Sequence, residues 1–240
     1  MRRSTPGVVT KEQLDEERAR LAEAHEPRFV IETLEPFVLE RRRERIRRVL
    51  DGRLLSVAVL FDSPYDPHNG AAVVRTCDAF GVQRLHVVPR PGMPFLAAAS
   101  VARGAGKWVD VVTHGDAEAA VAAVSAAGLE LVAAHPEGEL LPEDLAAVPR
   151  LCVVLGNERD GIQPALARAC SRRVRVPMRG FVDSLNVSVT SALLLHAAVA
   201  GRRGDLDAPL RAALYAKALY FSLPKAEAIL RARGSGGSLG

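Results

Sequence analysis

At 240 residues, the chain is long enough for one large domain or for one domain with extensions. Apolar residues make up 48% of the chain and aromatic residues only 5%, which predicts a core of Ala, Val and Leu and excludes general disorder. No run of about 18 uncharged apolar residues occurs, which excludes a membrane helix. The amino-terminal segment lacks the apolar stretch of a secretory signal.

The formal net charge of +4 permits a polyanionic partner without requiring one. Cys77, Cys152 and Cys170 are scattered along the chain and show no C-x-x-C spacing. An odd, scattered set fits reduced thiols better than a disulfide framework or a zinc site. We therefore expect a cytoplasmic protein without a structural metal.

Residues 1–50 are rich in charged helix formers and predict a helical, arginine-rich extension. Most of its arginines crowd into residues 40–48. A charge run usually means a solvated helix face, and this segment taken alone favours that interpretation. The alternative is a basic helix that lies along phosphates.

From residue 54 onward, short β-branched apolar runs alternate with helical segments, and this alternation predicts an α/β fold with a parallel sheet covered by helices on both faces. Gly81 and Gly128 are expected to end helices, and Asp116 to begin one. The sheet domain is expected over 51–203, followed at 204–240 by C-terminal helices and a flexible tail. The expected strands are 54–61, 84–88, 129–135, 151–156 and 173–178, and the expected helices are 71–81, 115–128, 163–171, 184–201, 207–221 and 224–234.

Ligands of parallel sheets bind outside the carboxyl ends of the strands, which here lead into loops 62–69, 135–142, 156–162 and 177–184. In the first loop, Asn69 stands where a helix begins, and Arg75 follows in that helix. One interpretation is a helix capped by asparagine with an arginine at its surface. The alternative is that both side chains project towards a phosphate-sugar substrate, because guanidinium binds oxyanions bidentately.

The loop that follows strand 151–156 reads GNERDG, in which Gly156 and Gly161 bracket four polar residues. Glycines at these places let the backbone approach a ligand closely. Glu158 has an obvious role here, which is to orient a substrate group or a neighbouring arginine. Neither G-x-G-x-x-G nor a P-loop occurs in the sequence, so nothing supports a nicotinamide or nucleoside triphosphate site.

A third set of polar residues stands in DSLNVSV, where the helix of residues 184–201 begins. Ser184 is explained as an ordinary helix cap. Asn186 is not, because asparagine is a poor residue inside the first turn of an apolar helix unless its amide has a partner. We therefore interpret Asn186 as a functional residue.

Three segments, HNGAAVVRT, VVLGNERDGI and VPMRGFVDSLNVSVTSALLLHA, resemble in this order motifs 1, 2 and 3 of the SpoU branch of the SPOUT RNA methyltransferases. The likeness spans roughly residues 38–220 and is greatest to the TrmH-type tRNA (guanosine-18) 2′-O-methyltransferases. It implies methyl transfer from S-adenosylmethionine to a ribose 2′-hydroxyl of tRNA, without a metal or a membrane. It also implies a homodimer with the active site at the subunit interface, and a C-terminal trefoil knot where the alternation alone predicts an ordinary doubly wound sheet.

Carried over to this sequence, the resemblance implies five catalytic residues, which are Asn69, Arg75, Glu158, Ser184 and Asn186. S-adenosylmethionine would bind among loops 134–138, 156–161 and 176–185, through Ala134, His135, Leu155, Gly156, Asn157, Gly161, Val176, Met178, Ser184 and Leu185. With RNA as the substrate, phosphate contact becomes the favoured interpretation of the arginine run. The expected RNA contacts are Arg41, Arg42, Arg43, His68 and Arg75.

The resemblance implies that Arg75 acts on the ribose 2′-hydroxyl. A role as general base is demanding, because a guanidinium normally stays protonated. Alternatively, Arg75 only positions a phosphate and stabilises charge while the proton leaves to water. In-line alignment of the methyl group with the oxygen should supply much of the rate.

Four residues depart from the family pattern near the expected site. Arg159 and Asp160 stand where many relatives have Gly or Lys and a small or aromatic residue. Asp183 stands where the tRNA subgroup often has Gln, and Gly70 replaces an aliphatic residue. An rRNA 2′-O-methyltransferase, a non-catalytic RNA-binding protein of the same fold and an unrelated α/β enzyme for a small nucleotide-like substrate therefore stay open as alternatives.

Overall fold

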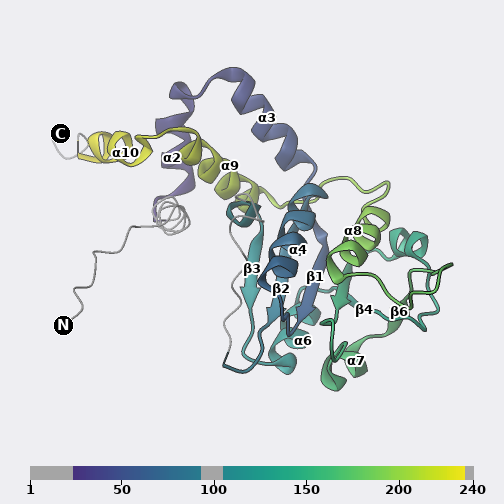
Figure 1. Cartoon of the computed structure of the whole chain (residues 1–240). Coiled ribbons are helices and arrows are strands. Elements are labelled where there is room, and N and C mark those ends of the chain that lie inside the picture. The colour runs from purple at the N-terminus through teal and green to yellow at the C-terminus, as the bar shows by residue number, and fades with distance from the viewer. Residues whose placement is uncertain (1–23, 93–104, 236–240) are drawn as a thin grey trace, which may run out of the picture. The chain divides into compact units, whose positions relative to one another are not determined.

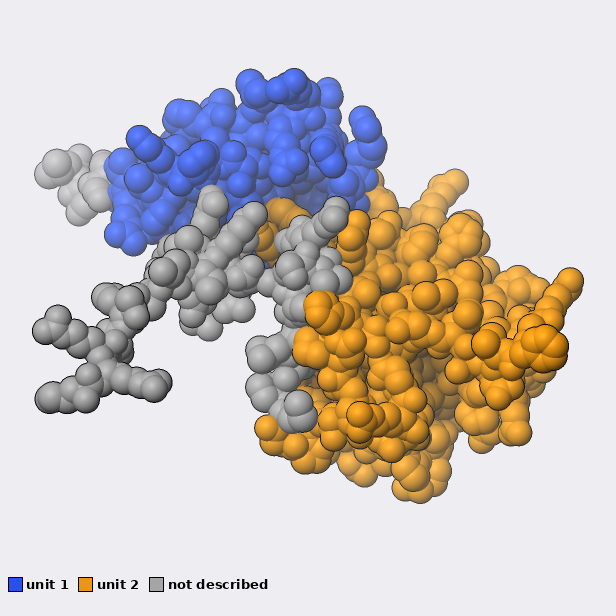
Figure 2. Space-filling model, in the orientation of Figure 1, with its two compact units in different colours: residues 1–50, 206–240 blue, residues 51–205 orange. Residues whose placement is uncertain are grey.

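The computed structural model describes residues 24–92 and 105–235, which belong to two compact units (Figure 2). One unit is Asp51–Asp205, and the other combines Met1–Leu50 with Leu206–Gly240. The part of the expected amino-terminal extension before residue 24 and the end of the expected tail from residue 236 lie outside the described residues. Within the described part of the chain, no helix is both long enough and apolar enough to cross a bilayer.

The unit Asp51–Asp205 is built on a six-stranded sheet whose strand pairs are all parallel, in the order β3-β2-β1-β5-β4-β6 (Figure 1). The predicted parallel sheet is thereby confirmed. The central strand β1 is buried along nearly its whole length, as its mostly apolar sequence predicts. The strands are β1 Leu54–Asp62, β2 Val82–Val88, β3 Asp110–Thr113, β4 Glu130–Ala134, β5 Leu151–Leu155 and β6 Arg172–Val174.

Two strands differ from the sequence-based expectation. The edge strand β3 was not expected, since it has only four residues, of which every second one is exposed. The last strand, β6, ends at Val174 instead of reaching residue 178. The chain leaves the sheet there because the Arg175 backbone N–H donates to the Leu140 carbonyl, 3.0 Å away, and Pro177 has no N–H to donate.

Helices cover both faces of the sheet, as predicted. The core beneath α4 (Pro67–Ala79), α8 (Val187–Ala198) and the 3-10 helix η3 (Pro142–Ala147) is distinct from the core beneath α6 (Ala117–Ala126) and α7 (Pro164–Ala169). Asp116 caps α6, and Gly81 and Gly128 adopt positive φ after their helices, as expected. At Gly81 a Cβ would lie 2.8 Å from the Gly52 carbonyl oxygen, so only glycine fits this close approach.

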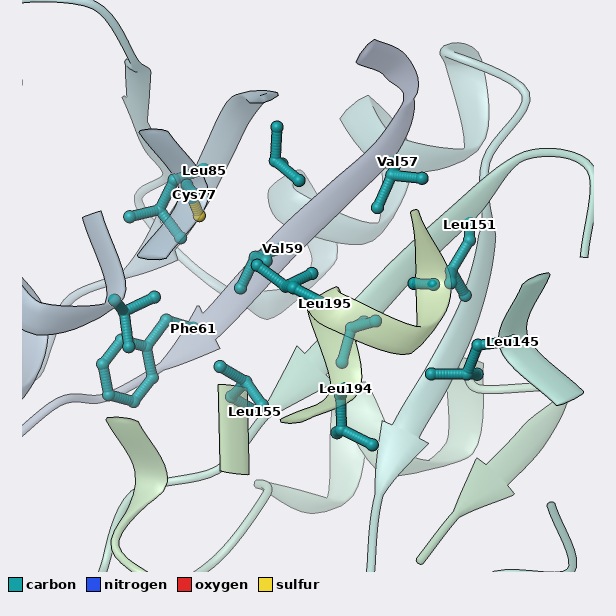
Figure 3. Close-up of a cluster of buried hydrophobic side chains, with 14 of the residues drawn as sticks. Val57, Val59, Phe61, Cys77, Leu85, Leu145, Leu151, Leu155, Leu194 and Leu195 are labelled. Atoms are coloured by element: carbon teal, nitrogen blue, oxygen red, sulfur yellow. The ribbon is translucent and has the colours of Figure 1, made fainter. Parts of the chain in front are cut away.

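The larger core lies between the sheet and the helices α4 and α8. Figure 3 shows Leu194 and Leu195 of α8 beside Val59, Phe61 and Leu155 of the two central strands. All five side chains are buried. This packing fixes the start of α8 relative to the carboxyl ends of β1 and β5, which is where the candidate site is found.

The second unit consists of helices from both ends of the chain. They are α2 (Pro27–Leu34), the 3-10 helix η1 (Glu35–Phe37), α3 (Glu40–Asp51), α9 (Ala208–Ser222) and α10 (Ala226–Ser235), and α2 packs against α9. The Tyr215 hydroxyl of α9 donates to Glu35 at 2.6 Å, and Arg47 of α3 forms an ion pair with the same carboxylate. The hydrogen bond to Tyr215 and the charge of Arg47 lower the pKa of Glu35.

Candidate active site

Helix α4, which follows the β1–α4 loop, carries the two candidate residues of the first motif. Asp66 caps α4, since its carboxylate accepts the His68 backbone N–H at 2.8 Å, and Pro67 is the first helical residue. The interpretation of Asn69 as the cap is therefore wrong, because α4 begins before it. The Asn69 side chain is left to make tertiary contacts.

Arg75 lies on α4 beyond Asn69, and its side chain is exposed. Within the described residues, this side chain makes no hydrogen bond and no ion pair. Its guanidinium therefore keeps its full donor capacity for a ligand.

The β5–α7 loop forms a closed turn around Glu158. Asn157 and Gly161 exchange two backbone hydrogen bonds of 3.1 and 3.2 Å, and the Asn157 side-chain oxygen accepts the N–H groups of Arg159 and Asp160. A Cβ on Gly156 would lie 2.4 Å from the Gly161 carbonyl carbon, so the two ends of the turn require glycine at position 156. Glu158 stands exposed on a turn whose shape is fixed by its own backbone bonds.

Asn186 begins α8 and is its cap, which corrects the expectation for Ser184. Its side-chain oxygen accepts both the N–H of Ser188 at 2.8 Å and the hydroxyl of the same residue at 2.6 Å. Ser184 precedes the helix by three residues and is exposed. The sequence could not separate the two, because serine and asparagine are both favoured caps.

A hydrogen-bonded chain joins the three motif segments. The Asn69 amide N–H donates to the Glu158 carboxylate, and the Asn186 amide N–H donates to the Asn69 oxygen at 3.1 Å. The Asn186 side chain thus caps α8 with its oxygen and binds Asn69 of α4 with its nitrogen. It therefore both begins its own helix and connects this helix to α4. Residues separated by 89 and 117 positions in the sequence meet at the carboxyl edge of the sheet.

The remaining strand ends come together beside this chain of contacts. The end of β6 lies against the β4–η3 loop, where the His135 N–H donates to the Val174 carbonyl at 2.9 Å and the Leu140 N–H donates to the Arg173 carbonyl at 3.0 Å. A Cβ on Gly138 would lie 2.5 Å from the Val174 carbonyl carbon, so the two backbones pass with no room for a side chain. The chain then continues through residues 175–186 into α8.

The sequence model described as "SpoU rRNA Methylase family" matches residues 56–196. The chain belongs to this family. Membership confirms the resemblance seen in the sequence, and with it the prediction of an S-adenosylmethionine-dependent RNA methyltransferase.

Individual members of the SpoU family extend this likeness. The tRNA (guanosine(18)-2′-O)-methyltransferase of Escherichia coli K12 is 38% identical over 156 residues, which are 64% of this chain and 67% of the relative. The enzyme of the same name from Thermus thermophilus is 35% identical over 185 residues, 75% and 94% of the two chains.

Solved structures of SpoU proteins are similar in fold to this chain. The A. aeolicus TrmH/SpoU tRNA modifying enzyme covers 84% of this chain and 98% of its own, with a TM-score of 0.64 and 25% identity. The SpoU methyltransferase AviRb from Streptomyces viridochromogenes, solved with AdoMet, covers 62% and 60% of the two chains, with a TM-score of 0.53 and 28% identity.

The loops after β4, β5 and β6 fit the cofactor of a SpoU methyltransferase in their chemistry. These strands are neighbours in the sheet, so their carboxyl ends offer backbone N–H and C=O groups along one edge. Val176 and Met178 are half-buried, and Leu185 is 36% exposed, so apolar side chains for an adenine ring stand beside those polar groups. The other expected cofactor residues lie on the same strand ends and loops, namely Ala134, His135, Leu155, Gly156, Asn157, Gly161 and Ser184.

The expected RNA-binding arginines of α3 do not all face solvent. Arg42 donates to the Ser222 hydroxyl at 3.2 Å, and Arg43 forms an ion pair with Glu40. Arg41 is exposed and, in the part of the chain that the structure describes, its side chain has no partner. Some arginines of the run therefore make contacts within their own unit, whereas Arg41 points outward.

One group of side chains near the site was not expected from the sequence. The Tyr65 hydroxyl donates to Asp160 at 3.0 Å, and the guanidinium carbons of Arg90 and Arg159 lie 3.5 and 4.6 Å from the centroid of the Tyr65 ring. Two members of this group, Arg159 and Asp160, carried a signal in the sequence, which was their departure from the family pattern. Nothing in the sequence pointed to Tyr65 or Arg90, because their contacts join different loops.

Proposed function

We propose that the protein methylates the ribose 2′-hydroxyl of a guanosine in tRNA, as the names of its E. coli and Thermus relatives say of those enzymes. The observation that carries this proposal is the hydrogen-bonded chain from Glu158 through Asn69 to Asn186, with Arg75 exposed on the same helix as Asn69. It supports an active set of polar residues rather than a fold that has lost its chemistry.

In this proposal, each residue has a distinct task. S-adenosylmethionine supplies the electrophilic methyl group when it is bound. Glu158, Asn69 and Asn186 hold the starts of α4 and α8 in one arrangement, so that the RNA ribose is received in a fixed geometry. Arg75 holds a phosphate and donates to the 2′-oxygen as negative charge develops there, while the proton of the hydroxyl passes to water. Ser184 lies on the segment that leads into α8 and would contact the substrate.

The direct test is transfer of labelled methyl from S-adenosylmethionine to unmodified tRNA, followed by digestion and identification of the product nucleoside. We expect 2′-O-methylguanosine at one tRNA position. A methylated base, or no transfer to tRNA, would overturn the proposal. Transfer to 23S rRNA alone would favour the activity in the name of the Burkholderia relative, which is 32% identical over 161 residues.

We also infer that the protein acts as a homodimer. Val189 and Leu193 are four residues apart on one side of α8 and are 46% and 42% exposed. Phe181 and Val182, in the preceding loop, are exposed as well. An apolar surface of this extent next to Asn186 fits a second copy of the chain, which would place the active site at the subunit interface.

A charge on this apolar surface is expected to separate the subunits. Leu193→Glu should raise the dissociation constant of the dimer at least about 100-fold, because the carboxylate would be buried without a partner. Light scattering after gel filtration measures the molar mass across a dilution series, and methyl transfer should fall as the monomer forms. The same substitution at Val111, a 37% exposed residue of the edge strand β3, is the control. A dimer that is unchanged in Leu193→Glu would refute this interface.

We further propose that the chain after β6 is threaded as a trefoil knot. The contact of Val174 with Gly138, and the hydrogen bonds of Arg173 and Arg175 with Leu140, support a segment held tightly inside the β4–η3 loop. An experimental structure in which this segment runs outside the loop would overturn the threading.

A further inference from the structure

Three side-chain contacts join two segments at the carboxyl edge of the sheet. One segment is 62–69, which leads from β1 into the first turn of α4, and the other is 158–163, which leads from β5 to α7. The contacts are Asp62 with Gln163, Tyr65 with Asp160, and Asn69 with Glu158. Because the position falls along the second segment as it rises along the first, the two segments lie in antiparallel order. The bond between Asn69 and Glu158 is therefore the last of three connections between the same two segments.

The first connection is anchored in the interior. Asp62 is only 1% exposed, and its carboxylate accepts the backbone N–H and the side-chain amide of Gln163, each at 2.7 Å, as well as the Ser63 hydroxyl at 2.9 Å. Ser63 has a φ of 46°, and among the described residues it is the one non-glycine with positive φ. Such backbone strain persists only where the surroundings enforce it. This end of the two segments is therefore held firmly.

The middle connection holds the two residues that follow Glu158. The Tyr65 hydroxyl donates to Asp160 at 3.0 Å, and the guanidinium carbon of Arg159 lies 4.6 Å from the centroid of the Tyr65 ring. The guanidinium carbon of Arg90 lies against the same ring, 3.5 Å from its centroid. Arg159 and Asp160 are the two residues at which the β5–α7 loop departs from the family pattern, so both departures meet at one tyrosine.

The position of Glu158 depends on contacts with the segment 62–69, whereas the shape of its turn does not. The turn closes on itself through the two backbone hydrogen bonds between Asn157 and Gly161. A displacement of this closed turn would carry the Glu158 carboxylate away from the Asn69 amide. Misplacement of a positioned group by 1 Å can lower a reaction rate about 10²-fold.

We propose that Tyr65 is a positioning residue, which acts on methyl transfer through Glu158 and Asn69 because it holds Arg159 and Asp160. The inference rests on the proposed role of the Glu158–Asn69–Asn186 chain in receiving the ribose, and it adds a residue that touches neither substrate nor cofactor. It also gives a reason for the two departures from the family pattern, since a glycine or another small residue at these places would lose the contact with the tyrosine.

The first test observes the Asn69 side chain directly. In isotope-labelled protein without substrate, the NMR signals of the Asn69 side-chain amide are identified by their absence in Asn69→Ala. We expect these signals to shift in Tyr65→Phe and in Asp160→Ala, because the amide no longer meets the Glu158 carboxylate in the same geometry. Tyr65→Phe keeps the ring and its stacked guanidinium groups, so it loses only the hydrogen bond. Asp160→Asn keeps an acceptor for the Tyr65 hydroxyl and should restore the wild-type signals.

The second test measures the reaction. Tyr65→Phe should lower kcat for methyl transfer about threefold through the loss of one hydrogen bond, and Tyr65→Ala about tenfold or more through the additional loss of the stack. The KM for tRNA and the Kd for S-adenosylmethionine should change less than about twofold, because Tyr65 contacts neither of them in this proposal. Tyr215→Phe is the matched control, since it removes a similar bond between a tyrosine hydroxyl and a carboxylate, that of Glu35, and should keep the wild-type kcat.

A double variant shows whether Tyr65 acts through Asn69. In an Asn69→Ala background, Tyr65→Ala should lower kcat less than about twofold, because the contact that Tyr65 positions is already absent. Single-turnover transfer of labelled methyl is sensitive enough to measure such slow variants. An equal loss in both backgrounds would overturn the proposal, because Tyr65 would then act independently of Asn69.

Unshifted Asn69 signals in Tyr65→Phe and Asp160→Ala would also overturn the proposal, and so would a wild-type kcat in Tyr65→Ala. A loss of affinity for S-adenosylmethionine or for tRNA at unchanged kcat would contradict it as well, because Tyr65 would then serve binding. The NMR signals are recorded without methyl transfer. Failure of this inference is therefore distinguishable from failure of the proposed tRNA methylation, which the product assay shows.

Discussion

Arg75→Ala is expected to lower kcat for methyl transfer to tRNA by about 10²–10³-fold, because it removes a donor that would bind the 2′-oxygen as charge develops. The variant should fold normally, since the Arg75 side chain is exposed and has no partner among the described residues. Single-turnover transfer of labelled methyl at saturating tRNA measures the effect on the chemical step. Circular dichroism and the melting temperature check the fold.

Arg203→Ala removes the same charge from an exposed position and should keep the wild-type rate. Arg203 is next to Gly204, whose Cβ would meet the Asp51 carbonyl near the start of β1, at the opposite edge of the sheet. Added guanidine should partly restore transfer by Arg75→Ala, because a small cation can occupy the vacated place. Arg75→Lys separates the two possible roles. A positioning cation predicts an unchanged pH profile at a lower rate. A general base predicts a rate that rises with pH and levels off at a lower pH in the lysine variant, since lysine loses its proton more readily than arginine. A wild-type kcat in Arg75→Ala would remove this residue from the reaction.

The local pattern of the sequence was enough to predict most strands of the sheet, because these strands are buried and apolar. LLSVAVLF and LCVVLG became the neighbouring strands β1 and β5. Asn69 follows β1 in the first turn of α4, and Glu158 lies in the loop that follows β5. The parallel arrangement alone brings both residues to one edge. Strand β3 escaped prediction since DVVT is short, lies at the edge and is half exposed.

The roles of single polar residues could not be predicted in the same way. Asp66, Asn69, Ser184 and Asn186 are all acceptable helix caps, and which of them acts as a cap depends on where the chain turns after the strand. Asn186 proved to be both cap and tertiary partner, a combination that no local rule contains. The stack of Arg90 on Tyr65 depends on a contact between two loops, which hydrophobic periodicity does not report.

The burial of Arg53 in the core also could not be predicted from the local sequence. Replacement of this residue should have the largest effect on stability. The residue precedes β1 and is only 1% exposed, although an arginine at this place reads as a surface residue. Its guanidinium donates to Gln83 at 2.6 Å, to Asp78 at 3.0 and 3.1 Å and to the carbonyl of Trp108. Burial lowers the pKa of Arg53, and it raises the pKa of Asp78, an effect that the charge of Arg53 opposes.

Arg53→Met is expected to lower the free energy of unfolding of the Asp51–Asp205 unit by about 3 kcal/mol. This is the lower end of the range for a broken buried ion pair, and it applies because the Asp78 side chain is still 32% exposed. The melting temperature should fall by roughly 6–12 °C. Fluorescence of the single tryptophan, Trp108, follows the transition, and Arg203→Met, at an exposed position, should stay within about 0.5 kcal/mol of wild type.

The partner substitution identifies the cause of this loss. Arg53→Met/Asp78→Asn should be more stable at pH 7 than Arg53→Met, because it removes the carboxylate that was left without its cation. In the single variant the pKa of Asp78 is raised further above its unfolded value, so the folded state binds a proton more readily than the unfolded state. The difference between single and double variants should therefore shrink as the pH falls through the folded pKa of Asp78. A difference that is independent of pH would show that lost packing, not the uncompensated charge, destabilises the unit.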